Sequence, residues 1–206
     1  MNATEGGGLR PLRDLGGRAV QYAALFRGIN VGGKNAVRMA ELRQMLEGLG
    51  LRDVRTYIQS GNAVFAADAD AAALREAIEA GFAARFGFAS GVAVRSADEL
   101  RALVEGLPFA PAEIEAAEAA NPDVEHLYAY FLDGPAAPGA AEALSAGAAG
   151  PDRLVARGRE LFLLCFGSVR DSKLAARLPR AFPSATARNW RTVVKLLELA
   201  GESAAP

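Results

Sequence analysis

The chain has 206 residues, of which 51% are apolar, and its formal net charge is −1 at pH 7. The apolar content excludes a disordered chain, and the balanced charge excludes the overall basic field that attracts nucleic acid without sequence preference. With one cysteine and one histidine, the chain has no internal disulfide and no zinc site of the usual Cys/His type.

The apolar segments are all too short to span a membrane, and the first nineteen residues contain no apolar core of a secretory signal. We therefore predict a cytoplasmic protein without membrane contact. We interpret residues 1–19, which include three consecutive glycines, as a flexible tail.

Residues 20–96 predict a β-α-β-β-α-β unit. Apolar residues recur at helical spacing after Met39 and again after Asp70, which is a suitable helix cap. Two apolar strands joined through Gln59–Asn62 are typical of a hairpin. The predicted strands cover residues 22–26, 54–58, 63–66 and 92–95.

The second half of the chain repeats this order of elements. Predicted strands cover residues 127–132, 154–156, 160–166 and 184–188, with helices at 140–146 and 173–179 and a final helix at 189–200. The predicted fold is α+β, with two ferredoxin-like (βαββαβ) subdomains plus a C-terminal helix. The predicted divisions are residues 1–19 (tail), 20–96 (first subdomain), 97–124 (connecting helix or linker), 125–188 (second subdomain) and 189–206 (C-terminal helix and tail).

A glycine-rich polar segment, Arg27–Asn35, lies between the first predicted strand and the first predicted helix. Glycine allows positive φ angles and close approach of a ligand to the backbone, so this composition indicates more than a connector. Its spacing matches the G-x-x-x-x-G-K pattern of a nucleotide P-loop. However, Asn35 replaces the Ser or Thr that binds magnesium, and the helix begins too late to face a phosphate, which argues against a P-loop.

The cations indicate an anion-binding cleft. The chain has three lysines against twenty arginines, and Lys34, Lys173 and Lys195 each lie in a polar segment. Arg188 could grip a phosphate or carboxylate, and Asn189 opens a helix whose free N–H groups favour anions. Solvated surface charges and helix caps explain the same residues, and this alternative stays open.

Several of these segments resemble one family. The segments are Leu25–Asn35, Thr56–Asn62, Ser172–Leu174, and Thr186–Trp190 with Thr192 and Lys195. They resemble the bacterial domain-of-unknown-function 1697 family (DUF1697) over about residues 22–199. The resemblance implies two ferredoxin-like subdomains, and it implies no established activity.

Other functions have weaker support. Ferredoxin-like sheets can bind RNA through exposed strand aromatics such as Tyr57 or Tyr128, but no RNP1-like sequence is present, and Trp190 has the spacing of a core residue. His126 and Cys165 are interpreted as structural, because no nucleophile with an adjacent base is recognisable.

We therefore predict a binding module for an anionic, phosphate-bearing ligand such as a nucleotide or nucleic acid, and we expect neither a cofactor nor a metal. One alternative is a small-molecule enzyme using Lys34 or Lys173 as a reactive amine in the same cleft. Another is a structural role in which the motifs hold the two subdomains together. The sequence leaves the oligomeric state open. The predicted ligand-binding residues are Arg27, Asn30, Gly32, Gly33, Lys34, Gln59, Asn62, Lys173, Arg188, Asn189 and Lys195.

Overall fold

The computed structural model describes residues 19–148 and 150–202. The chain forms two compact units. Of these residues, unit 1 comprises 19–97 and 199–202, and unit 2 comprises 98–148 and 150–198. Both units are α+β, and each contains a four-stranded antiparallel sheet. The predicted tail at 1–19 lies almost wholly outside the described residues.

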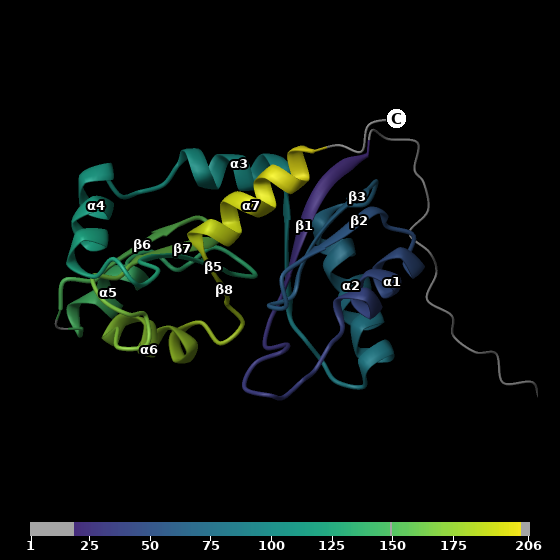
Figure 1. The fold of residues 1–206 in the computed structure, drawn as a ribbon, viewed down its shortest axis with the longest axis horizontal. Coiled ribbons are helices and arrows are strands. Elements are labelled where there is room, and N and C mark those ends of the chain that lie inside the picture. The colour runs from purple at the N-terminus through teal and green to yellow at the C-terminus, as the bar shows by residue number, and fades with distance from the viewer. Residues whose placement is uncertain (1–18, 149, 203–206) are drawn as a thin grey trace, which may run out of the picture. The chain divides into compact units, whose positions relative to one another are not determined.

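Unit 1 contains a sheet with the strand order β2-β3-β1-β4, with all neighbours antiparallel (Figure 1). Two helices alternate with the strands along the chain. The elements are β1 (Val20–Phe26), α1 (Met39–Gly48), β2 (Arg52–Tyr57), β3 (Asn62–Ala67), α2 (Ala71–Phe86) and β4 (Val92–Ser96).

The core of unit 1 forms where α1 and α2 cover one face of this sheet. Alternate residues of β1, among them Tyr22 and Phe26, point to this face, as a strand with a period of two requires. Leu74, Ile78 and Phe82 of α2 are completely buried against it, and the predicted cap Asp70 accepts from the N–H groups of Ala72 and Ala73. Each fully buried side chain of this size stabilises the fold by about 1.5–3 kcal/mol.

Unit 2 begins with two helices and then repeats the arrangement, with the strand order β6-β7-β5-β8 (Figure 1). Its core gathers around Leu161 and Leu163 of β7 and Leu174 and Leu178 of the helix that follows. Its elements are α3 (Ala97–Glu105), α4 (Pro111–Ala120), β5 (Leu127–Phe131), α5 (Ala140–Ala146), β6 (Arg153–Arg157), β7 (Glu160–Leu164), α6 (Lys173–Ala181), β8 (Thr186–Asn189) and α7 (Trp190–Gly201). The last residues of α7, from Leu199 onward, belong to unit 1.

The repeat reaches the level of strand register. In unit 1, the buried Arg95 of β4 pairs with Ala23 of β1, and in unit 2 the buried Arg188 of β8 pairs with Ala129 of β5. A small residue opposite each arginine leaves room for a long side chain on that face. In both halves the last strand runs directly into a helix, α3 after β4 and α7 after β8.

Residues 97–124, predicted as a connecting helix or linker, form two helices. This segment is part of unit 2 from Asp98 onward. Pro111 begins α4, a position where its missing N–H costs nothing. Among the described residues, every helix is too short or too polar to cross a membrane.

Candidate functional site

The glycine-rich segment folds into a small hairpin of its own. Val31 and Lys34 form an isolated antiparallel bridge, and the Lys34 N–H donates to the Val31 carbonyl at 3.1 Å. Gly32 and Gly33, with φ of 59° and 73°, form the two-residue turn between them. Positive φ at both central residues is the geometry of a type I′ turn, which glycine adopts at the least cost. The turn projects its residues into solvent.

Two asparagine side chains hold this loop in place. The Asn30 amide nitrogen donates to the carbonyls of Val37 and Gln59, both at 2.9 Å, and its oxygen accepts from the Val37 N–H at 2.7 Å. The Asn35 amide donates to the Gly28 carbonyl at 3.0 Å. Because Asn30 reaches Gln59 of the β2–β3 hairpin, the loop and that hairpin are joined within unit 1.

The hairpin turn is built around buried groups. Asn62 has an exposed fraction of 0%, and its amide donates to the Tyr57 carbonyl and the Ser60 hydroxyl. The Gly61 carbonyl accepts from the Phe26 N–H at 2.8 Å, where β1 ends. Asn30 and Asn62 therefore hold segments of unit 1 together through hydrogen bonds to its backbone.

Ile58 is an unusual residue for this turn. Its φ of 47° lies in the left-handed region, which is a rare conformation for a β-branched residue, and its side chain is 49% exposed. Val31, at the glycine turn, is 65% exposed. Each lies one residue from a partner in the Asn30–Gln59 hydrogen bond, so the two apolar side chains occupy the same end of unit 1.

Cationic side chains surround this end. Arg27, Lys34 and Arg38 all lie at exposed positions within or beside the loop. A shallow depression of about 780 Å³ adjoins them, lined by Arg38, the first turn of α1, Asn30 and Gln59. We name this region, made of residues 27–38 and the turn 58–61, the loop surface.

The P-loop interpretation has no structural support. Helix α1 begins at Met39, five residues after Lys34, with Arg38 as a cap that makes no side-chain hydrogen bond. Asn35 is used to close the loop on Gly28. The turn at Gly32–Gly33 therefore does not lead into a helix whose N-terminus faces it, as phosphate binding by a P-loop requires.

The remaining predicted residues lie in unit 2, where most have structural partners. Arg188 is only 9% exposed and donates to the Ala187 carbonyl, and burial lowers the pKa of its guanidinium to about 10. Asn189 caps α7 by accepting from the Thr192 N–H at 3.0 Å, as predicted. Lys195 forms an ion pair with Glu198 at 2.9 Å. Lys173 is exposed at the first position of α6.

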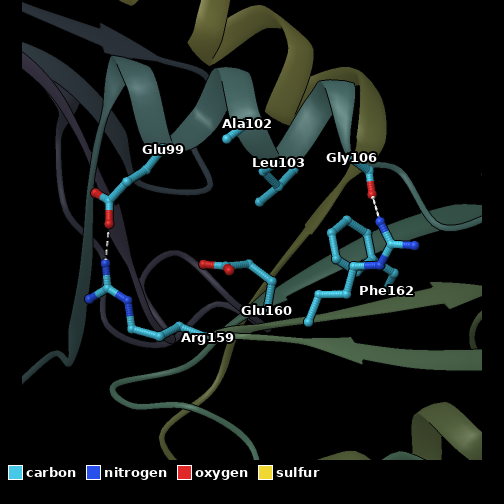
Figure 2. Close-up of a pocket in the computed structure, with 8 residues that line it drawn as sticks. Glu99, Ala102, Leu103, Gly106, Arg159, Glu160 and Phe162 are labelled. Carbon is cyan, nitrogen blue, oxygen red and sulfur yellow. Dashed lines mark hydrogen bonds and ion pairs between the residues drawn. The ribbon is translucent and has the colours of Figure 1, made fainter.

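A small pocket in unit 2 lies between α3 and the β6–β7 hairpin (Figure 2). It encloses about 310 Å³. At one end Arg159 pairs with Glu99, and at the other Arg157 donates to the Gly106 carbonyl at the end of α3. Figure 2 shows Glu160 between the Glu99–Arg159 pair and the Phe162 ring. Arg159 is paired with Glu99, and Arg157 bonds the end of α3. We therefore interpret these side chains as a polar contact between α3 and the β6–β7 hairpin.

Unit 1 contains a matching contact. Arg55 of β2 donates to the Leu199 carbonyl and, at 2.6 Å, to the Glu202 carbonyl, at the end of α7. Arg157 occupies the corresponding strand of unit 2 and bonds the end of α3 in the same way. In both units an arginine of the second strand satisfies carbonyls that a helix end leaves unpaired.

A second pocket of unit 2, of about 550 Å³, is lined in part by His126 and Trp190. His126 is 4% exposed, with Nδ1 at 2.7 Å from the Cys165 carbonyl and Nε2 at 2.8 Å from the Asn121 carbonyl. Both partners are backbone carbonyls, which act as acceptors. His126 joins the α4–β5 connection to the end of β7 and is structural, as its sequence position indicated.

Cys165 is buried, and its surroundings favour the neutral thiol. Burial raises the pKa of its thiol to about 12, and the Asp152 carboxylate adds to this effect, while a hydrogen bond with Ser172 opposes it. Among the described residues, the His, Cys, Asp and Glu side chains form no group of three suited to a metal ion.

The pocket residues of unit 2 gave only a faint signal in the sequence. Arg157, Gly158, Arg159 and Glu160 mark a polar hairpin turn, but their partners Glu99 and Gly106 lie more than fifty residues earlier. Residue spacing cannot reveal such a long-range pairing, because it depends on which elements meet in three dimensions.

Comparison with known proteins agrees with this organisation. The chain is similar to the conserved bacterial protein SP0830 from Streptococcus pneumoniae, with 30% identity and a TM-score of 0.69, covering 89% of this chain and 99% of that chain. A crystal structure of an unknown protein from Galdieria sulphuraria covers 90% of this chain and 93% of that chain, but its identity of 12% and TM-score of 0.25 carry no argument. No curated protein matches the chain.

The family described as "Protein of unknown function (DUF1697)" matches residues 20–162, which is more than half of the sequence and includes the whole loop surface. The resemblance noted from the polar segments is therefore confirmed. The chain belongs to the DUF1697 family of proteins of unknown function.

Proposed function

We propose that the protein binds a phosphate-bearing anion through the loop surface of unit 1. The observation that carries this proposal is the pre-organised turn Val31–Lys34, which holds Lys34 in solvent while Arg27 and Arg38 lie exposed at the two ends of the same loop. A lysine ammonium is a compact point charge suited to phosphate, and an arginine can donate two parallel hydrogen bonds to it.

The backbone of the turn supports the same proposal. A Cβ atom at Gly32 or Gly33 would meet nothing within 4 Å, so the space beside both residues is open. A phosphate could therefore approach the peptide N–H groups closely, as it does in other glycine-rich turns. The Asn30 and Asn35 hydrogen bonds fix the loop before binding, which reduces the conformational entropy that binding would otherwise cost.

The lysine-enzyme alternative has no comparable support. Lys34 and Lys173 are both exposed and therefore lack the desolvated surroundings in which lysine amines become nucleophiles. We keep Lys173 in the proposal as the accessible cation of unit 2, and we assign Arg188, Asn189 and Lys195 to structural contacts.

We also propose that both units are ferredoxin-like subdomains. The element order β-α-β-β-α-β, the central position of the first and third strands, and the antiparallel pairing of all neighbours support this interpretation in each unit.

Fluorescence anisotropy with labelled nucleotides, oligonucleotides and inorganic polyphosphate tests the proposed function. Lys34→Ala and Arg38→Ala should each weaken binding about tenfold and lower the salt dependence of the affinity by about one phosphate contact. Arg43→Ala is the matched control, because Arg43 is an exposed cation of α1 that pairs with Glu47 of the same helix. A weaker affinity of Lys173→Ala would show that unit 2 contributes to ligand binding. Equal affinity of wild type, Lys34→Ala and Arg38→Ala would overturn the proposal.

A further inference from the structure

We infer that the ligand of the loop surface is a single-stranded nucleic acid, whose phosphates meet the cations and whose bases pack on Val31 and Ile58. This inference rests on the proposed function and goes beyond it by naming the ligand class. It starts from two apolar side chains that the proposed phosphate contacts leave unexplained.

The exposure of these side chains is unusual in this chain. Among the described residues, the exposed large apolar side chains are Val20, Val31 and Ile58, and two of these three lie on the loop surface. The Asn30–Gln59 hydrogen bond holds the backbone next to each of the two, since Val31 follows Asn30 and Ile58 precedes Gln59. An apolar pair held in solvent by a rigid frame is typical of a binding surface.

The backbone of Ile58 adds a second observation. A φ of 47° costs a β-branched residue about 1–2 kcal/mol relative to glycine or asparagine, which suit this turn position. Ile58 is only half buried, with an exposed fraction of 49%. A strained backbone at a half-exposed isoleucine points to a contact made outside the chain.

The charges around this pair define the partner. Arg27, Lys34 and Arg38 lie at exposed positions on the loop that carries Val31, and Gln59, beside Ile58, adds an exposed polar side chain that can hydrogen-bond base edges. A duplex would offer only its phosphates and groove edges to a small protruding loop. A single strand offers phosphates and unstacked base faces together, which matches cations and apolar side chains on one surface.

The open shape of the surface agrees with this ligand. The depression beside the loop, of about 780 Å³, is shallow and open along the first turn of α1, from Arg38 to Glu41. An open surface suits a strand that passes across it. An enclosed pocket of 300–1,000 Å³ would be expected for a free nucleotide.

The test compares ligands with matched phosphate content. The probes are a labelled single-stranded RNA and DNA of about 12 nucleotides, the same sequence as a duplex, and inorganic polyphosphate as competitor. We expect the single strands to bind about tenfold more tightly than the duplex or polyphosphate at equal phosphate concentration.

Two variants separate base contact from charge. Ile58→Gly and Val31→Ser should weaken single-strand binding about fivefold or more and leave polyphosphate binding unchanged. Ile58→Gly relieves the positive φ, so it should also raise the free energy of unfolding, which a purely structural isoleucine would not do. Ile58→Asn provides a second variant that tolerates the same backbone.

The outcomes distinguish the two proposals. Equal binding of single strand, duplex and polyphosphate, unaffected by Ile58→Gly but weakened by Lys34→Ala, would overturn the nucleic-acid inference and leave anion binding in place. Binding of an acidic polypeptide such as polyglutamate, weakened by Ile58→Gly, in place of any oligonucleotide would also overturn it. Absence of binding to every phosphate-bearing probe would overturn both.

Discussion

Gly61 has both a positive φ angle and close neighbours at the position that a Cβ atom would occupy. Its φ is +78°, and a Cβ atom built there would lie 2.4 Å from Cδ1 of Ile29 and 3.0 Å from Cβ of Phe26. Its carbonyl also receives the Phe26 N–H. The hairpin turn can approach the end of β1 this closely only because the residue has no side chain.

We therefore expect Gly61→Ala to destabilise unit 1 strongly. The positive φ alone costs alanine about 1–2 kcal/mol, and the overlap with Ile29 adds about 1–3 kcal/mol. Gly87→Ala is the matched control, because Gly87 has a φ of +76° but open space around its Cβ position. Urea unfolding should show a loss for Gly61→Ala at least about twice that for Gly87→Ala. Equal losses would show that Ile29 moves aside without cost.

At the scale of elements, the loop surface depends on hydrogen bonds between a side chain and distant backbone. Asn30 bonds Val37 just before α1 and Gln59 in the β2–β3 hairpin, so one amide connects three segments. The glycine turn contributes no packing of its own, since its residues are exposed. Its shape therefore comes from these polar contacts.

Asn30→Gly should loosen the loop and weaken ligand binding. Glycine keeps the φ of 54° accessible, so the variant removes only the hydrogen bonds, and unpaired groups of Val37 and Gln59 cost about 1–3 kcal/mol. The measurement is the free energy of unfolding together with hydrogen exchange at residues 30–38. Gln59→Ala is the control: it keeps the accepting carbonyl and should retain the stability of the wild type. A stable Asn30→Gly variant with unchanged exchange would contradict the pinning role.

At the scale of the whole molecule, unit 2 contains three weakly acidic groups whose pKa is raised by burial. Burial raises the pKa of the Cys165 thiol and of the Tyr130 hydroxyl to about 12, and it also raises the pKa of Tyr128. All three residues belong to unit 2. Their neutral forms are favoured in the folded state, so the unfolded chain releases their protons at lower pH.

Unit 2 should therefore lose stability on the alkaline side. The contribution of these groups is complete below the unfolded pKa values of about 9 to 10, and it is lost as the pH rises towards 12. Trp190, the one tryptophan of the chain, reports the urea midpoint of unit 2. We expect this midpoint to fall between about pH 8 and pH 10.5, with a shallower fall in Cys165→Ala. The same slope in both proteins would show that the thiol does not contribute.

The local elements of the fold were predictable from the sequence. The helix that begins at Met39, the cap at Asp70 and the helix capped by Asn189 all occur as predicted. The strands agree to within a few residues, and the four-stranded antiparallel sheets follow from them. Hydrophobic periodicity and capping act between residues close in sequence, so they can be read without tertiary structure.

The roles of the polar residues could not be predicted in the same way. From the sequence, Asn30, Asn62 and Arg188 were predicted as ligand contacts together with Lys34. Amide and cationic side chains can all bind anions, and residue type alone does not show which of them are already used in the fold. In the tertiary structure Asn30 and Asn62 bond carbonyls of their own chain, and Arg188 lies 9% exposed beside Ala187. Lys34 alone of this group remains at an exposed turn.

The family, the repeated order of elements and the position of the glycine-rich turn after β1 all follow from the amino-acid sequence. Which polar groups face solvent, and which satisfy the backbone, depends on the tertiary structure. The physical reason is that a polar side chain bonds whichever donor or acceptor the fold brings within about 3 Å, and these partners are often distant in sequence. Ile58 became informative for the same reason, because its strain and its exposure exist only in three dimensions.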